Sequence, residues 1–329
     1  MRFDEACEKA FNRTESFPPR YGWAKKAFDS CASNPDLYKS NEGIEELVLD
    51  LGVGKSMVKS LRHWGQAFRI FSPVKRSYYP TPIGETFFTD DGWDPYCEYA
   101  DTSWLLHWWL LAPKSFAPVW WLTFNEFTGI EFTAEELEQF VIDRSQKWEP
   151  AANGIKKDVN ALIRMYSSGA TARATFEDLV DCPFRELDLL RPSQRESGMF
   201  RFLIGEKATL SSAVVAFSCI DFFARSASKG KTITIAKLAT EAGSPGRAFK
   251  LPEPALLEQL EETCRANSKL LKLTSAAGVP QLVLEKDPRE VATKILFEHY
   301  KNFSENIHEP KYLLVGEEAD TAIVPELVS

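Results

Sequence analysis

One short segment holds the densest group of carboxylates outside the Glu-rich helices. Glu177, Asp178, Asp181 and Glu186 lie within ten residues of each other. Carboxylates are the ligands that Mg²⁺ prefers, and bound Mg²⁺ can activate water and stabilise a leaving oxygen. Asp178 and Asp181 are three residues apart, a spacing that lets them share a helical face. We therefore predict Asp178 and Asp181 as magnesium ligands and Asp178, Asp181 and Glu186 as catalytic carboxylates. The plainer and commoner role for such residues is to cap helices and solvate a loop.

Other nuclease patterns are absent from the sequence. The pairs Glu206-Lys207 and Glu285-Lys286 are adjacent, whereas restriction-type nucleases use a Glu-x-Lys spacing. The four histidines, at positions 63, 107, 299 and 308, are dispersed and form no His-Asn-His motif. The second chemical route is a tyrosine nucleophile, for which Tyr78 or Tyr79 would serve, although aromatic residues in a hairpin more often pack. The catalytic chemistry therefore stays open between these two routes.

A second group of charged residues is basic. Between Leu51 and Gly84 the sequence has no Asp or Glu, although the whole chain carries a formal net charge of −8. The same window holds six cations, which are Lys55, Lys59, Arg62, Arg69, Lys75 and Arg76. Lys25 and Lys26 add positive charge nearby. An acid-free basic surface on an acidic protein favours contact with the phosphates of double-stranded DNA.

The elements expected to carry these cations are two helices and a hairpin. Apolar periodicity predicts a helix over Asn41–Asp50, a break at Gly52 and Gly54, and a longer helix from about Lys55 to Phe68. Two apolar and aromatic segments around Lys75-Arg76 predict a β-hairpin, and Thr81-Pro82 begins the next helix.

This order of elements is typical of a winged helix-turn-helix. We predict as DNA-binding residues those on the polar face of the second helix and at the hairpin tip: Lys55, Ser56, Lys59, Arg62, His63, Gln66, Lys75 and Arg76. The alternative is a helical packing module whose charges are only solvated.

The remaining sequence divides into three parts. Residues 96–205 are predicted to form a helical middle domain whose tryptophans at 104, 108, 109, 120 and 121 belong to the core rather than to a base-stacking surface. Residues 206–308 repeat the helix and hairpin pattern as a second winged-helix-like domain, with a turn at 244–250. Its second helix carries Glu253, Glu258, Glu261 and Glu262, so we expect it to bind protein. Residues 309–329 are predicted to form an acidic tail. The winged helix-turn-helix described above belongs to an N-terminal domain of residues 1–95.

The composition is that of an ordinary globular protein. The 329 residues are 44% hydrophobic and 26% charged, and the fold class we predict is mainly α, or α+β with small winged hairpins. Six scattered cysteines form no C-x-x-C pair, and the first residues lack an apolar signal segment. The most apolar run, Trp104–Ala112, is too short to cross a bilayer. We expect a cytoplasmic protein with reduced thiols that does not bind membranes.

Five sequence blocks, in this order, resemble a bacterial domain-of-unknown-function family associated with DNA phosphorothioation operons. They begin at Phe17 (FPPRYGW), Leu51 (LGVGKSMV), Trp104 (WLLHW), Asp181 (DCPFREL) and Ser244 (SPGRAFKL). The resemblance implies a DNA-nicking protein of a defence operon, with a cysteine desulfurase, an ATPase and a reductase-like sulfur-transfer protein as partners. It carries no active-site motif that can be transferred to particular residues.

We therefore expect a protein that binds and nicks DNA during phosphorothioate modification linked to anti-phage defence. A non-catalytic DNA-binding adaptor or transcriptional regulator is the alternative, and a pure scaffold is a third. The sequence leaves open whether the protein forms a homodimer and which DNA sequence it recognises.

Overall fold

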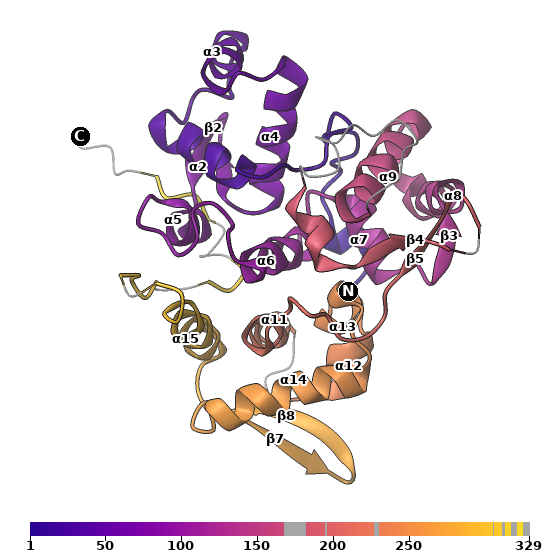
Figure 1. The fold of residues 1–329 in the computed structure, drawn as a ribbon, viewed down its shortest axis with the longest axis vertical. Coiled ribbons are helices and arrows are strands. Elements are labelled where there is room, and N and C mark those ends of the chain that lie inside the picture. The colour runs from indigo at the N-terminus through magenta and orange to yellow at the C-terminus, as the bar shows by residue number, and fades with distance from the viewer. Residues whose placement is uncertain are drawn as a thin grey trace.

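The structure, a computed structural model, describes residues 1–167, 182–194, 196–226, 230–304, 306–310, 313–316 and 321–324. Helices dominate these ranges, and small antiparallel sheets lie among them, so the fold is α+β as predicted (Figure 1). Within the described ranges, no helix combines the length and the apolar character needed to cross a bilayer.

The N-terminal part holds the predicted basic helix and hairpin. Helix α3 begins after Ser40, whose side chain accepts a hydrogen bond from the Gly43 backbone, and α5 begins in the same way after Thr81. Strands β1 and β2 pair antiparallel, with Val74 opposite Ser77 at the tip. The elements are α1 (Phe3–Ala6), α2 (Trp23–Ser33), α3 (Asn41–Leu51), α4 (Lys55–Ala67), β1 (Phe71–Val74), β2 (Ser77–Pro80) and α5 (Pro82–Phe88).

The middle part is built on two helices, α6 (Ala100–Leu111) and α7 (Pro118–Asn125), in which nearly every residue is buried. The tryptophans at 104, 108, 109, 120 and 121 are at most 1% exposed, which confirms that they belong to the core. A three-stranded sheet in the order β3-β5-β4 lies beside these helices. The elements are α6 (Ala100–Leu111), α7 (Pro118–Asn125), β3 (Glu131–Thr133), α8 (Ala134–Ser145), η1 (Gln146–Trp148), α9 (Ala152–Tyr166), η2 (Pro183–Leu187), β4 (Leu190–Pro192) and β5 (Met199–Phe202).

The C-terminal part differs from prediction in two details. The predicted turn at 244–250 contains a short helix, because the Ser244 side chain accepts a hydrogen bond from the Arg247 backbone and starts it. The predicted hairpin gains a third strand, which pairs with β8. The elements are α11 (Ser212–Arg225), β6 (Thr232–Thr234), α12 (Ile235–Thr240), α13 (Pro245–Phe249), α14 (Glu253–Ala266), β7 (Leu271–Ala276), β8 (Val279–Leu284) and α15 (Pro288–Tyr300).

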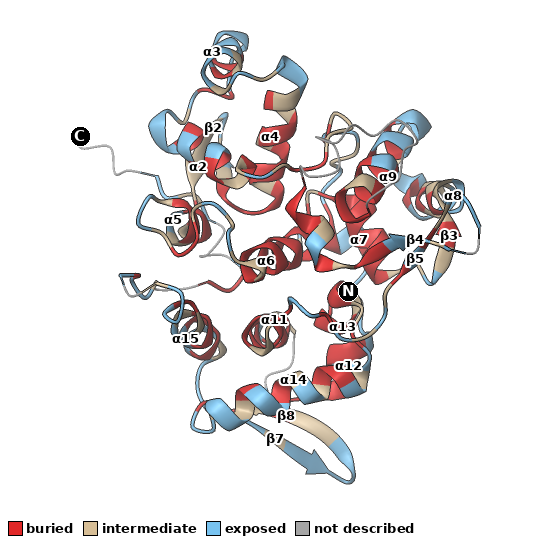
Figure 2. Cartoon of the chain, viewed as in Figure 1, coloured by how far each residue is buried: buried red, intermediate tan, exposed pale blue. Residues whose placement is uncertain are grey.

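Helices α6 and α11 lie at the centre of the molecule and are mostly buried (Figure 2). The Trp108 indole donates to the Asp221 carboxylate over 2.8 Å, and Arg225 pairs with the same carboxylate at 2.9 Å. The Thr102 and Tyr300 hydroxyls lie 2.8 Å apart. The Trp108–Asp221 and Thr102–Tyr300 contacts join the middle and C-terminal parts. The boundaries proposed at residues 95, 205 and 308 stay a prediction.

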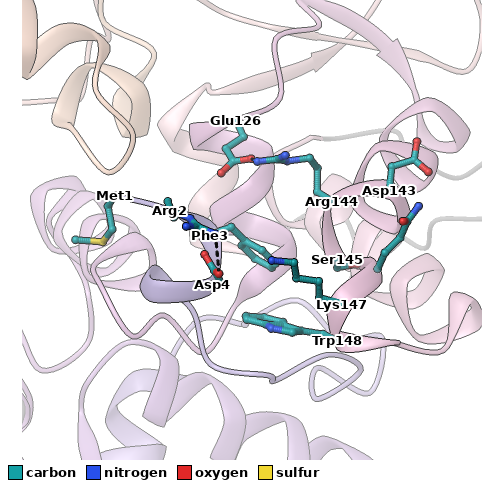
Figure 3. A pocket seen from close by; sticks show the side chains of 11 residues that line it. Met1, Arg2, Phe3, Asp4, Glu126, Asp143, Arg144, Ser145, Lys147 and Trp148 are labelled. Carbon is teal, nitrogen blue, oxygen red and sulfur yellow. Dashed lines mark hydrogen bonds and ion pairs between the residues drawn. The ribbon is translucent and has the colours of Figure 1, made fainter.

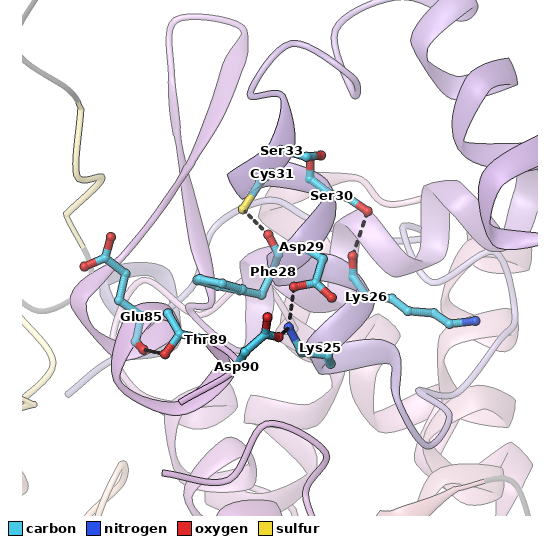
Figure 4. Close-up of polar contacts among 10 residues, drawn as sticks. All are labelled: Lys25, Lys26, Phe28, Asp29, Ser30, Cys31, Ser33, Glu85, Thr89 and Asp90. Carbon is cyan, nitrogen blue, oxygen red and sulfur yellow. Dashed lines mark hydrogen bonds and ion pairs between the residues drawn. The ribbon is translucent and has the colours of Figure 1, made fainter. Parts of the chain in front are cut away.

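Lys25 is a structural residue rather than a source of surface charge. Its ammonium group lies 2.6 Å from a carboxylate oxygen of Asp29 and 2.7 Å from one of Asp90, and its side chain is only 10% exposed (Figure 4). The pair with Asp90 joins α2 to the loop after α5, whereas Asp29 lies on α2 itself. Lys25 therefore adds little positive charge to the surface, contrary to the expectation from its position in the sequence.

Candidate nucleic-acid interface

Helix α4 separates an apolar face from a basic one. It begins after Gly54, at the end of a turn in which Gly52 adopts the left-handed backbone with φ 63°. Val58, Leu61 and Trp64 are each at most 1% exposed and anchor the helix in the core. The opposite face keeps a polar row at the surface, partly or fully exposed, and it consists of Lys55, Ser56, Lys59, Arg62 and Gln66.

The β1–β2 hairpin presents the other predicted contacts. Lys75 and Arg76 are exposed at its tip, where Lys75 has φ 58°. The Tyr78 backbone donates to the Pro35 carbonyl oxygen over 2.8 Å, and the Ser77 hydroxyl donates to the Asp36 carboxylate. The hairpin is therefore held against the turn that follows α2.

Two cations on α4 also have partners within the protein. The Arg62 guanidinium donates to the Tyr38 carbonyl oxygen over 3.3 Å, which fixes the direction of this partly exposed side chain. The Lys55 ammonium group lies 3.9 Å from a Glu45 carboxylate oxygen, with the lysine side chain 46% exposed. A contact this long at the surface is weak, so Lys55 stays available to a phosphate.

Arg69 does not belong to the basic surface, although it lies in the acid-free window. Its side chain is buried and donates to the carbonyl oxygens of Trp109, Ala112 and Pro113, over 3.2, 3.1 and 2.6 Å. The guanidinium thus caps the C-terminal end of α6, where carbonyl groups have no partner within the helix. Counting it among the DNA-facing cations would be wrong.

His63 is present at the predicted face as a neutral group. The residue is 8% exposed, and burial, followed by the nearby charges of Arg13 and Arg62, lowers its pKa to about 3. A neutral imidazole can hydrogen-bond to DNA but cannot neutralise a phosphate. His63 therefore differs from the other predicted contacts in the kind of interaction it offers.

A cavity of about 510 Å³ adjoins this basic face. Its walls come from α4, from the hairpin through Tyr78, from the loop that follows α1, and from Phe116 between α6 and α7. The loop contributes Lys9 and Arg13, which stand with Lys59 and Arg62 around the same space. Lys9 and Arg13 could not be predicted as part of this face from the sequence, because neither lies in the acid-free window.

The predicted carboxylates are only partly within the described residues. Asp178 and Asp181, like Glu177, lie outside them. Glu186 is exposed on η2, and its carboxylate accepts a hydrogen bond from the Tyr21 hydroxyl. Burial, and then this contact, raise the pKa of Tyr21 well above its usual range. The structure thus brings together one residue from each of two sequence blocks, Tyr21 and Glu186, which the sequence alone did not pair.

Among the described residues, no three His, Cys, Asp or Glu side chains are arranged to hold a metal ion. Those residues alone do not fit a magnesium site, and the predicted ligands Asp178 and Asp181 are not among them. Of the two tyrosines considered as nucleophiles, Tyr78 packs edge-on against Phe71 and Tyr38, with ring centroids 5.3 and 5.7 Å apart. Tyr79 pairs with Ser72 in the hairpin.

A second cavity, of about 450 Å³, lies between the N-terminus and α8 (Figure 3). The centroids of the Phe3 and Trp148 rings lie 4.5 Å apart at its wall, and Arg144 pairs with Glu126 beside them. It shares no lining residue with the cavity at α4. The second cavity is lined by both acidic and basic side chains, and its Arg144 already pairs with Glu126. The basic face at α4 is therefore the better candidate for binding nucleic acid.

Fold and surface together define an α+β protein, mostly helical, with a basic helix and hairpin at one end. Residues 11–300 match a family described as "Protein of unknown function (DUF4007)". The chain belongs to this family, which confirms the predicted resemblance to a domain-of-unknown-function family.

Two crystal structures are similar over nearly the whole chain. That of SspB has a TM-score of 0.84 and 34% sequence identity, covering 92% of this chain and 91% of SspB. That of magnesium ion-bound SspB has a TM-score of 0.84 and 35% identity, covering 92% and 90%. No curated protein matches the chain.

Proposed function

We propose that this protein binds double-stranded DNA through α4 and the β1–β2 hairpin, and that it nicks DNA during phosphorothioate modification linked to anti-phage defence. The observation that carries the DNA-binding part is the charge of this face. Lys55, Lys59 and Arg62 line one side of α4, and Lys75 and Arg76 extend the charge at the hairpin tip, on a chain with a net charge of −8.

The arrangement also supports a winged helix-turn-helix. Helix α3, the turn at Gly52 and Gly54, helix α4 and the hairpin follow one another in the order that such modules have. In this interpretation α4 is the helix that enters the major groove and the hairpin tip contacts the phosphate backbone. The exposed lysines would supply affinity, and Gln66, whose amide both donates and accepts hydrogen bonds, could read a base.

Salt-dependent binding tests this part. Phosphate contacts release counterions, so each one contributes about 0.9 to the slope of log affinity against log salt. We expect a Lys55→Gln/Lys59→Gln/Arg62→Gln variant to lower that slope by about 2.7, measured by fluorescence anisotropy with a short labelled duplex. The matched control is Lys237→Gln/Lys269→Gln/Lys272→Gln, which removes three cations from the C-terminal part. A triple α4 variant that folds normally and keeps the wild-type slope would refute the interface.

Nicking is the part of the proposal that rests on family membership and on the similarity to SspB. Its magnesium dependence rests on the Asp178 and Asp181 pattern and on the magnesium ion bound to the second SspB structure. We expect purified protein to nick supercoiled plasmid, and EDTA to abolish nicking. Asp178→Asn or Asp181→Asn should weaken nicking without loss of DNA binding, and Glu186→Gln tests the third carboxylate.

The alternatives give different results in the same assay. If a tyrosine is the nucleophile, nicking should persist in EDTA and a covalent protein–DNA adduct should appear on a denaturing gel. Nicking should then be lost in Tyr79→Phe. Salt-dependent binding without any nicking would identify a DNA-binding adaptor or regulator instead. The operon partners (a cysteine desulfurase, an ATPase and a reductase-like sulfur-transfer protein) are tested by co-purification with the full chain.

A further inference from the structure

The cavity beside α4 has one wall that the basic window does not include. This wall is the loop of residues 8–16, which runs between α1 and the block that begins at Phe17. The opposite wall is α4, through Lys59, Arg62, His63 and Gln66. Because two of the proposed DNA contacts, Lys59 and Arg62, line the cavity, it is continuous with the proposed interface.

The loop is held in one conformation by a buried carboxylate from α9. Asp158, 2% exposed, accepts a hydrogen bond from the Asn12 backbone over 2.6 Å and one from the Thr14 hydroxyl over 2.9 Å. The Arg164 guanidinium donates to the Ser16 carbonyl oxygen over 3.3 Å. A surface loop that is tied from behind at several points keeps the positions of its outward side chains.

Three strained backbone positions indicate that contacts with the rest of the protein enforce the conformation of the loop. Asn12, Glu15 and Ser16 have φ values of 56°, 49° and 68°. All three lie in the left-handed region of the backbone, which residues other than glycine rarely adopt. Such conformations cost on the order of 1–3 kcal/mol each and persist where the surrounding structure enforces them. Here the surrounding contacts are those made by Asp158 and Arg164.

The charges around the cavity fit a nucleic-acid strand. Lys9, Arg13, Lys59 and Arg62 supply four positive charges, and Glu8 and Glu15 supply two negative ones. The two cations of the loop and the two of α4 thus line the same cavity of about 510 Å³. A linear polyanion that leaves the α4 face would pass between these two pairs of cations.

We propose that loop 8–16 is the second half of a clamp for DNA, in which Lys9 and Arg13 contact the phosphate backbone of the strand that α4 holds from the other side. The proposal rests on the proposed function, because it needs α4 to face DNA. It adds a contact surface outside the winged-helix elements, on a loop that α9 fixes in place.

Charge neutralisation in the full chain tests the clamp. We expect Lys9→Gln/Arg13→Gln to lower the salt slope for a short labelled duplex by about 1.8, with thermal unfolding unchanged. The matched control is Glu8→Gln/Glu15→Gln, which alters the same loop but removes negative charge. It should bind at least as tightly as wild type.

The α4 triple variant, measured beside these two, separates the possible outcomes. A lower slope for both the loop variant and the α4 variant supports the clamp. A lower slope for the α4 variant alone overturns the clamp and leaves the proposed function standing. No effect of the α4 variant refutes the proposed interface, and the clamp falls with it. Weaker binding by the Glu8 and Glu15 control would also overturn the clamp, because the loop would then act through its shape and not its charge.

Discussion

Arg69 gives the sharpest test of how the basic end of the molecule is joined to the core. Its guanidinium donates to three carbonyl oxygens at the end of α6, and its own carbonyl oxygen accepts from the Thr81 hydroxyl. We consider Arg69→Met, which keeps an unbranched apolar stem but removes every donor of the side chain. Because φ at this position is +61°, arginine and methionine carry the same backbone strain, and the comparison isolates the guanidinium.

The size of the effect follows from these contacts. Hydrogen bonds from a charged group contribute about 1.5–3 kcal/mol each, and a buried carbonyl oxygen left without its donor costs about 1–3 kcal/mol. The three bonds share one desolvated group, so we expect the free energy of unfolding to fall by about 4 kcal/mol rather than by the sum. Arg69→Lys should lose about half as much, since an ammonium group can reach fewer of the carbonyls.

Urea denaturation followed by circular dichroism measures this loss, and DNA binding supplies an independent result. Since Arg69 is buried, Arg69→Met should keep the wild-type salt slope under conditions where it is folded. A loss of stability below about 1 kcal/mol would refute the capping role. A slope lower by about 0.9, with stability unchanged, would add Arg69 to the DNA-facing residues.

Two further predictions concern single residues. Burial raises the pKa of Asp158 to about 6, so the stability that its protonation contributes is complete below the unfolded pKa of about 3.9 and is lost as pH rises through 6. Between about pH 4 and 7, the free energy of unfolding from urea denaturation should fall by roughly 3 kcal/mol more for the wild type than for Asp158→Asn. Equal pH profiles for the two proteins would contradict this. At Gly84 an added Cβ would lie 2.0 Å from the Ile70 carbonyl oxygen, so Gly84→Ala should cost about 2 kcal/mol or more. Gly54→Ala, which meets no atom within 4 Å, should cost less than about 1 kcal/mol in the same measurement, and equal losses would refute the steric argument.

The elements of the basic end could be predicted because their signals are local. Two glycines separate α3 from α4, Thr81-Pro82 starts α5, and the apolar residues of α4 repeat at helical spacing. Each signal needs only neighbouring residues, and the structure confirms the helices and the hairpin. The core tryptophans could be assigned for the same reason, since leucines flank them at positions 105, 106, 110 and 111.

The errors and omissions arise from contacts between distant residues. In the sequence Arg69 resembles the surface cations around it, but the carbonyl oxygens that accept its hydrogen bonds lie 40 or more positions later in the chain. Loop 8–16 has no periodic pattern, and the carboxylate that fixes it lies 146 positions from Asn12. The Tyr21–Glu186 contact joins two blocks 165 positions apart. A single sequence indicates which residues can pair but not which of them the fold brings together.

The distribution of charge along the molecule favours one orientation on DNA. Helix α4, with its cations, and helix α14, where Glu258, Glu261 and Glu262 are exposed, lie toward opposite ends of the long axis (Figure 1). At about 0.15 M salt the Debye length is about 8 Å, so each end acts on DNA almost independently of the other. The exposed carboxylates of α14 therefore do not weaken binding at α4, yet they repel a phosphate backbone that approaches that helix directly. A negative net charge is consequently compatible with DNA binding here, because the basic helix, hairpin and loop attract DNA locally and the α14 carboxylates disfavour only an approach at their own helix.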